Sequence, residues 1–322
     1  MSLDLNARPS DPYERRAAII SFGSKERGDR AVQFIKHEYA DAPLLETCRR
    51  FVFTDFLDTP RSDIPAIRRV WFFPWIETQY ELGEALSHAL LANYKAVIDS
   101  CRRALELTVV GTYFQQAHVP EEQAKRWMKS EQDTPMFSRA LGVLLKTSRF
   151  SALDAKANWS TATKQFYWDL CDVVHVRGTR HGFRALQPSH LHLDDVSMRE
   201  FTAERLKETL DTIVRTCRHI AGIVAAENPV LLVGMDMAQK FGMNPPLSGF
   251  FDEAQAERLK QLILPEFAAV FERFRAEDDE VRSVVSWFEG LPDITDEGSA
   301  EQLREFEAEW ETVAPGVRQR RM

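Results

Sequence analysis

The chain has 322 residues, of which 44% are hydrophobic and 28% charged. These proportions are typical of a globular protein with a substantial core, and they exclude disorder over most of the chain. The formal net charge of −8 also excludes a protein that coats nucleic acid with a uniformly basic surface.

The charge is unevenly distributed along the chain. Residues 136–192, called the basic segment below, hold 8 Lys and Arg against 3 Asp and Glu, a net of +5. Residues 229–322, the acidic region, hold 10 Lys and Arg against 19 Asp and Glu, a net of −9. A phosphate-bearing partner such as RNA would therefore meet the basic segment.

The cysteines and missing motifs limit the chemistry further. We expect all four cysteines to be reduced core residues of a soluble, cytoplasmic protein, because they are far apart and form no CxxC pair: Cys48, Cys101, Cys171 and Cys217. No stretch is long and apolar enough for a membrane span, and residues 1–16 lack the apolar segment of a signal peptide. The sequence contains no P-loop, GxGxxG, HExxH or GxSxG motif, so we predict no metal and no cofactor.

Residues 1–75 are rich in aromatic side chains and interrupted by prolines, and we expect them to pack against the rest of the chain. Asp29 is a predicted N-cap for a short helix over Arg30–Tyr39. The apolar runs Phe51–Phe56 and Val70–Trp75 predict either short strands or hydrophobic docking segments, since such short runs have no diagnostic periodicity.

Residues 76–228 predict a central bundle of helices. Apolar side chains recur at helical spacing from Trp75 to Ala117, as one helix or as two joined near Asn93. Further helices are predicted over Pro135–Thr147, from about Ser160 to His181, and from Thr202 to about Ala226. Several long amphipathic helices with short connections favour a mainly α fold with antiparallel packing.

The acidic region predicts further helices. Residues 229–235 are expected to form a short extended segment, after which Asp252 caps a helix that Pro265 kinks or breaks. Asp279 is a predicted cap for the next helix, and Ser299 with Gln302 forms a capping box for a last acidic helix.

The candidate site lies at the end of the helix predicted to begin near Ser160. Its apolar stripe, which includes Phe166, Leu170 and Val174, continues by helical steps to Arg177 and His181. Four-residue spacing would place both on one face if the helix persists. Histidine can then remove a proton from a ribose 2′-hydroxyl, while arginine holds the phosphate.

Nearby residues extend this candidate site. His175, Arg180 and Arg184 add positive potential around Arg177 and His181. The alternative is structural: Gly178 and Gly182 end the helix, and the basic side chains satisfy its free carbonyl groups.

A second charged cluster lies in the helix predicted after Asn93. Glu106 follows Arg102 by four residues and Arg103 by three, so the three can pair along one helix. Glu106 would orient Arg177 or His181, with the two arginines as supporting phosphate ligands. Alternatively, these residues form an ion pair that only fixes the packing of the helix.

The Arg and His spacing, set in a run of long helices, resembles the HEPN superfamily over about residues 76–228. Catalytic members carry an Arg, four to six residues and then a His; here three residues separate Arg177 from His181, and five, including Pro188, separate Arg184 from His190. The resemblance implies an all-helical homodimer, acting as a metal-independent endoribonuclease of a bacterial defence or toxin system.

A second function stays open. Many domains that resemble this superfamily are non-catalytic binding modules, so the chain is alternatively a protein-interaction or scaffold module. The acidic region would then recruit a protein partner, or shield the basic segment when no partner is bound.

Overall fold

The computed structural model describes residues 12–60, 72–116, 118–175, 177–178, 202–242 and 249–295, with side chains from residue 24 onward and from residue 73 in the second range. These residues are mainly α-helical and form no β-strand, although Gly234 and Phe251 pair as an isolated parallel bridge. The predicted mainly α fold is confirmed.

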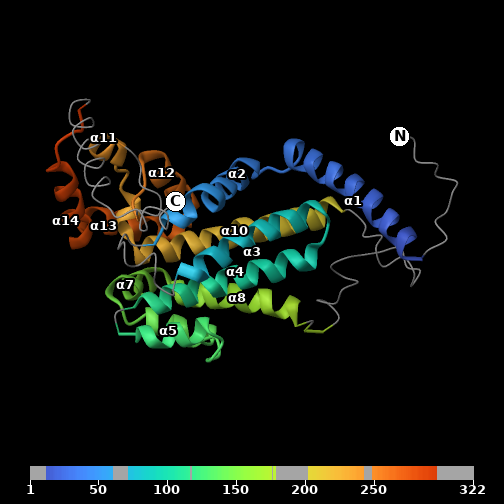
Figure 1. Cartoon of the computed structure of the whole chain (residues 1–322), viewed down its shortest axis with the longest axis horizontal. Coiled ribbons are helices and arrows are strands. Elements are labelled where there is room, and N and C mark those ends of the chain that lie inside the picture. The colour runs from blue at the N-terminus through green and yellow to red at the C-terminus, as the bar shows by residue number, and fades with distance from the viewer. Residues whose placement is uncertain are drawn as a thin grey trace, which may run out of the picture.

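Four long helices form the centre of the molecule: α3 (Phe72–Leu90), α4 (Tyr94–Gln115), α8 (Trp159–Val174) and α10 (Ala203–Glu227). α4 packs against each of the other three (Figure 1). The chain turns between α3 and α4 at Ala92, whose φ of 54° is left-handed. The apolar pattern from Trp75 to Ala117 therefore corresponds to two antiparallel helices.

The N-terminal part is also helical. It consists of α1 (Pro12–His37), α2 (Ala42–Arg50), a π-helix η1 (Phe51–Asp55) and a 3-10 turn η2 (Phe56–Asp58). The predicted cap at Asp29 is wrong, because this residue lies inside α1.

The strand alternative for the two short apolar runs is also wrong. Phe51–Phe56 is helical and Phe72–Trp75 begins α3, while residues 70 and 71 lie outside the described residues. Phe56 and Trp75 are buried and stack with ring centroids 6.3 Å apart. The short apolar runs thus serve as docking segments, since aromatic packing rather than strand pairing holds them.

Three shorter helices connect α4 to α8: α5 (Glu121–Met128), α6 (Phe137–Leu144) and α7 (Ser148–Ala157). α6 lies within the helix predicted over Pro135–Thr147. The helix predicted from about Ser160 to His181 is shorter than expected, because α8 ends at Val174. The predicted helix from Thr202 is confirmed as α10, with the Thr202 hydroxyl accepting from the backbone N–H of Arg205.

The described part of the acidic region contains η6 (Pro229–Leu232), α11 (Met237–Phe241), α12 (Glu253–Leu262), α13 (Pro265–Glu277) and α14 (Asp279–Glu289). The extended segment predicted at 229–235 is wrong, because it begins with a 3-10 turn. Asp252 forms a capping box with Gln255, and Pro265 separates α12 from α13, as predicted. Asp278 rather than Asp279 caps α14, and Ser299 with Gln302 lies outside the described residues.

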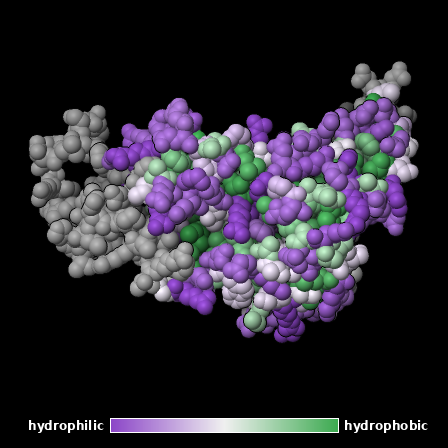
Figure 2. Space-filling view, turned by 180° about the vertical axis from the view of Figure 1, so that it is seen from behind, coloured by the Kyte–Doolittle hydropathy of each residue, from purple (hydrophilic) through white to green (hydrophobic). Residues whose placement is uncertain are grey.

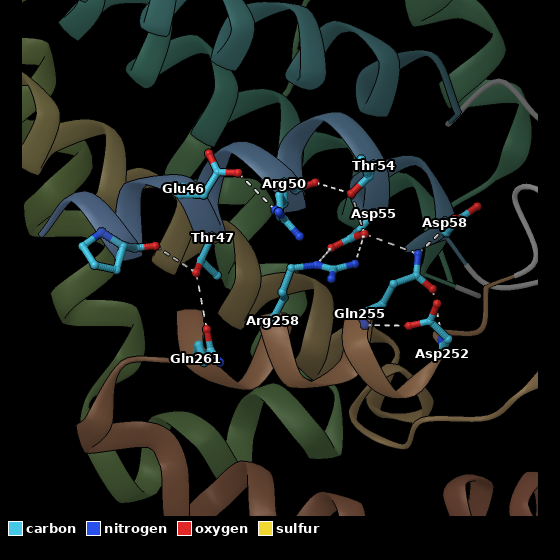
Figure 3. A network of polar contacts seen from close by, with 11 residues as sticks. Glu46, Thr47, Arg50, Thr54, Asp55, Asp58, Asp252, Gln255, Arg258 and Gln261 are labelled. Atoms are coloured by element: carbon cyan, nitrogen blue, oxygen red, sulfur yellow. Dashed lines mark hydrogen bonds and ion pairs between the residues drawn. The ribbon is translucent and has the colours of Figure 1, made fainter. Parts of the chain in front are cut away.

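Residues from all three predicted segments share one hydrophobic core cluster, for example Phe51, Leu105 and Phe271. A buried ion pair also joins the first segment to the last. The carboxylate of Asp55 is fully buried and accepts two hydrogen bonds from Arg258, at 2.7 and 2.8 Å (Figure 3). α12 is therefore fixed to the N-terminal part by both apolar packing and charge.

The cysteines and the surface agree with a folded globular chain. All four cysteines are free and buried, as predicted. Within the described ranges, every helix is too short or too polar to cross a bilayer. Figure 2 shows hydrophilic residues over most of one face, with hydrophobic residues between them in small patches.

Candidate functional site

The end of α8 decides the environment of Arg177. The helix stops at Val174, and the backbone N–H of Arg177 donates to the carbonyl of Asp172 at 2.9 Å. Gly178 follows with a φ of 76°, a left-handed conformation that glycine adopts without strain. Arg177 is therefore beyond the helix, as the structural alternative predicted.

Arg177 is exposed at this helix end. Its side chain is 78% exposed, and its Nη1 lies 3.2 and 3.5 Å from the carboxylate oxygens of Asp172. Such a surface pair contributes little to stability, so the guanidinium can exchange Asp172 for another anion. His175 is exposed as well, whereas Arg180, His181 and Arg184 lie outside the described residues.

The chain re-enters the bundle at Thr202, next to the first residue of α4. The hydroxyl of Tyr94 donates to the carbonyl of Thr202 at 3.2 Å and lies 3.3 Å from its backbone nitrogen. Figure 1 shows the C-terminal end of α8 and the N-terminal end of α10 at the same end of the bundle. The described chain therefore leaves the bundle after α8 and re-enters it before α10 at the same end.

The second predicted cluster forms a network within α4 and toward its neighbours. Arg102 donates to Glu106 at 2.9 Å, and Arg103 donates to Glu81 of α3 at 2.6 Å and to Asp99. The predicted pairing of Arg102 with Glu106 along one helix is confirmed. Both arginines are already engaged by carboxylates, so a phosphate would have to compete for them.

Glu106 does not contact Arg177. Its Oε1 instead accepts a hydrogen bond from Tyr167 of α8 at 3.3 Å. α8 continues for seven residues beyond Tyr167, or about 10 Å along its axis. Glu106 therefore orients Tyr167 in this structure. Burial and the charge of Glu106 both raise the pKa of the Tyr167 hydroxyl, which stays protonated as the donor.

The structure also shows a site that the sequence did not reveal, centred on Arg149 at the start of α7. Arg149 belongs to the basic segment, yet it donates to both carboxylate oxygens of Asp278, at 2.8 and 2.9 Å, and to Glu280 at 2.6 Å. Burial raises the pKa of Asp278, but the hydrogen bonds and charge of Arg149 outweigh it, so the pKa lies below its ordinary value.

A pocket of about 490 Å³ lies beside this ion pair. Gln115 and Gln116 at the end of α4 and Glu227 at the end of α10 contribute to its lining. A single sequence offers no signal for such a site, because Arg149 and Asp278 are 129 residues apart and both are ordinary surface residue types. In the sequence, Asp278 is only one of several acidic residues near the start of a predicted helix.

No group of three or more His, Cys, Asp or Glu side chains in the described part of the chain is arranged to hold a metal ion.

In comparisons with known proteins, no family model, no curated protein and no solved structure matches this chain.

Proposed function

We propose that this chain is a HEPN-like, RNA-directed protein of a bacterial defence or toxin system, in which the segment that begins at His175 contacts RNA. The observation that carries the proposal is the exposure of Arg177. Its guanidinium is 78% exposed and held by a single surface pair, at the start of a stretch that also contains Arg180, His181 and Arg184. An arginine of this kind is available to bind a phosphate in two-point geometry.

The proposed reaction is metal-independent cleavage of RNA. His181 would take the proton from a ribose 2′-hydroxyl, and Arg177 would stabilise the negative charge on the phosphate. His175, Arg180 and Arg184 would strengthen RNA binding through their positive potential. Reduced, buried cysteines suit the cytoplasm, where RNA is found, and the homodimer implied by the resemblance belongs to the same proposal.

The test uses the full chain, a labelled single-stranded RNA and EDTA. The wild type is compared with Arg177→Ala/His181→Ala. An Arg273→Ala variant serves as control, because Arg273 is exposed on α13. Cleavage should be lost in the double variant and retained in the control. Equal background cleavage by all three proteins would exclude the enzymatic proposal.

A second candidate is a non-catalytic interaction or scaffold module, which the net charge of −9 of the acidic region favours. Glu257, Glu266, Glu272 and Glu277 of this region are exposed on α12 and α13. Glu257 and Glu272 lie in surface pairs with Lys260 and Arg275, which a basic protein partner could replace. The pairing of Arg149 with Asp278 and Glu280 is a contact between the basic segment and the acidic region.

Deleting α12 and α13 would not test this second candidate. Leu259, Leu262, Phe267 and Phe271 of these helices are part of the main core, so the deletion would unfold the protein. Replacing the four exposed glutamates by glutamine leaves the core intact. Loss of a co-purifying partner in that variant, together with an unchanged melting temperature, would support the scaffold function. Retention of the partner would show that these four glutamates do not form its binding surface.

A further inference from the structure

α8 packs one of its sides against α4 and lies at the edge of the bundle (Figure 1). Its other side carries one large apolar residue that is exposed, Trp168, with half of its surface (50%) open to solvent. The indole of such a residue presents a flat apolar surface to water, and another planar ring can stack on that surface.

A packed aromatic layer supports the indole of Trp168. Its ring meets that of Tyr167 edge to face, with centroids 5.6 Å apart. Tyr167 in turn stacks on Phe137 of α6 at 3.8 Å and donates to Glu106 of α4 at 3.3 Å. Because three helices hold the residue next to it, the indole is preorganised, and a ring that stacks on it gives up less conformational freedom.

Cationic groups lie one helical turn from Trp168 in both directions. Lys164 precedes it by four residues, and Asp172, which holds the guanidinium of Arg177, follows it by four. Residues four apart lie on the same side of a helix, about 6 Å apart along its axis. The outer side of α8 therefore presents a cation, an indole and a second cation in a line.

Both cations can contact a phosphate. The ammonium of Lys164 has no ion-pair partner among the described residues. Arg177 engages Asp172 through Nη1 alone, at 3.2 and 3.5 Å, so its other nitrogen atoms can donate to a phosphate while this pair persists. The other carboxylate of α8, that of Asp169, lies about 100° around the helix from Trp168 and accepts from Gln165 at 2.8 Å.

We propose that Trp168 stacks on an unpaired base of single-stranded RNA while Lys164 and Arg177 contact the phosphates on either side. This inference rests on the function proposed above and adds its substrate class. The RNA has to be single-stranded, because the bases of a duplex stack on one another and do not reach the indole. Since every base has a flat face, the contact favours no particular sequence.

The test is fluorescence anisotropy of the full chain with a labelled single-stranded RNA whose 2′-hydroxyls are methylated, so that the proposed reaction cannot cleave it. Trp168→Leu should weaken binding by at least about fivefold, as expected for the loss of one stacked base. Trp168→Phe, which keeps a flat ring, should retain most of the affinity. Trp287→Leu is the matched control, because Trp287 is 46% exposed on α14, and it should bind as the wild type does.

An oligomer of the same length without bases separates stacking from charge. Trp168→Leu and the wild type should bind this oligomer equally, whereas an equal loss on both ligands would overturn the stacking. Melting temperatures show that the variants are folded. Unchanged RNA affinity of folded Trp168→Leu, with weaker binding by Arg177→Ala, would overturn this inference alone. Failure of the wild type to bind any RNA would instead overturn the proposed function, and this inference with it.

Discussion

Arg149 and Arg177 belong to the same basic segment, yet their environments are opposite. The Arg149 side chain is 18% exposed and engages two carboxylates of the acidic region, whereas that of Arg177 is 78% exposed and pairs with one neighbouring aspartate. Each adds one positive charge to the sequence, but only the charge of Arg177 is available to a partner. The net charge of a segment therefore overstates its capacity to bind an anion.

If burial distinguishes ion pairs in this way, the largest effect on stability is expected for the buried pair of Asp55 and Arg258. Arg258→Met leaves the fully buried carboxylate of Asp55 without its cation, and we expect the free energy of unfolding to fall by about 3 to 5 kcal/mol. Urea denaturation measures this loss.

The control for Arg258→Met is Arg275→Met, since Arg275 pairs with Glu272 on the surface of α13 and its loss should cost less than about 1 kcal/mol. The double variant Asp55→Leu/Arg258→Met should recover much of the stability, because it removes the unpaired charge. Similar losses of unfolding free energy for Arg258→Met and Arg275→Met would show that burial does not determine how much these ion pairs stabilise the protein.

Acid should reveal a second buried group, His219 of α10. Its ring stacks on Phe166 and its Nδ1 lies 3.2 Å from the hydroxyl of Thr163. Burial, with a smaller contribution from the charge of Arg215, lowers its pKa from 6.5 to about 3. The unfolded chain therefore binds a proton between these two pH values while the folded chain does not.

The contribution of neutral His219 to the free energy of unfolding is fully present above pH 6.5, and it is lost as the pH falls toward 3. By pH 4 the loss amounts to about 3 kcal/mol. His219→Gln lacks this titration, so its free energy of unfolding should decline less than that of the wild type over the same range. His175→Gln, at an exposed position, should follow the wild type. Parallel pH profiles for His219→Gln and the wild type would contradict a neutral buried histidine.

The ion pair of Arg149 should have a smaller effect. Arg149→Met removes three hydrogen bonds to carboxylates and one to the carbonyl of Glu227, but Asp278 keeps its bonds to the N-terminus of α14. We expect a loss of about 2 kcal/mol, measured by chemical denaturation. A loss below about 0.5 kcal/mol would place Arg149 with the ordinary surface pairs.

The sequence predicted most of the fold because local patterns determine it. Helical spacing located α4 and α10, and the cap at Asp252 and the break at Pro265 were confirmed. The N-terminal apolar runs remained ambiguous, because the burial of Phe56 depends on Trp75 of another helix. The Arg149 site was missed for the same reason, since its carboxylates come from the cap and the first turn of α14. The C-terminal end of α8 could not be predicted, because the sequence does not show whether Gly178 stops the helix or lies within it.

The last prediction returns to Arg177. Because its side chain is largely exposed, Arg177→Met should change the free energy of unfolding by no more than about 0.5 kcal/mol. Its effect should appear in RNA binding instead. Loss of one phosphate contact to single-stranded RNA lowers the slope of log affinity against log salt concentration by about 0.7, measured by fluorescence anisotropy. Arg273→Met should leave the slope unchanged. If both variants retain the wild-type slope, Arg177 makes no phosphate contact, and its exposure reflects only the end of a helix.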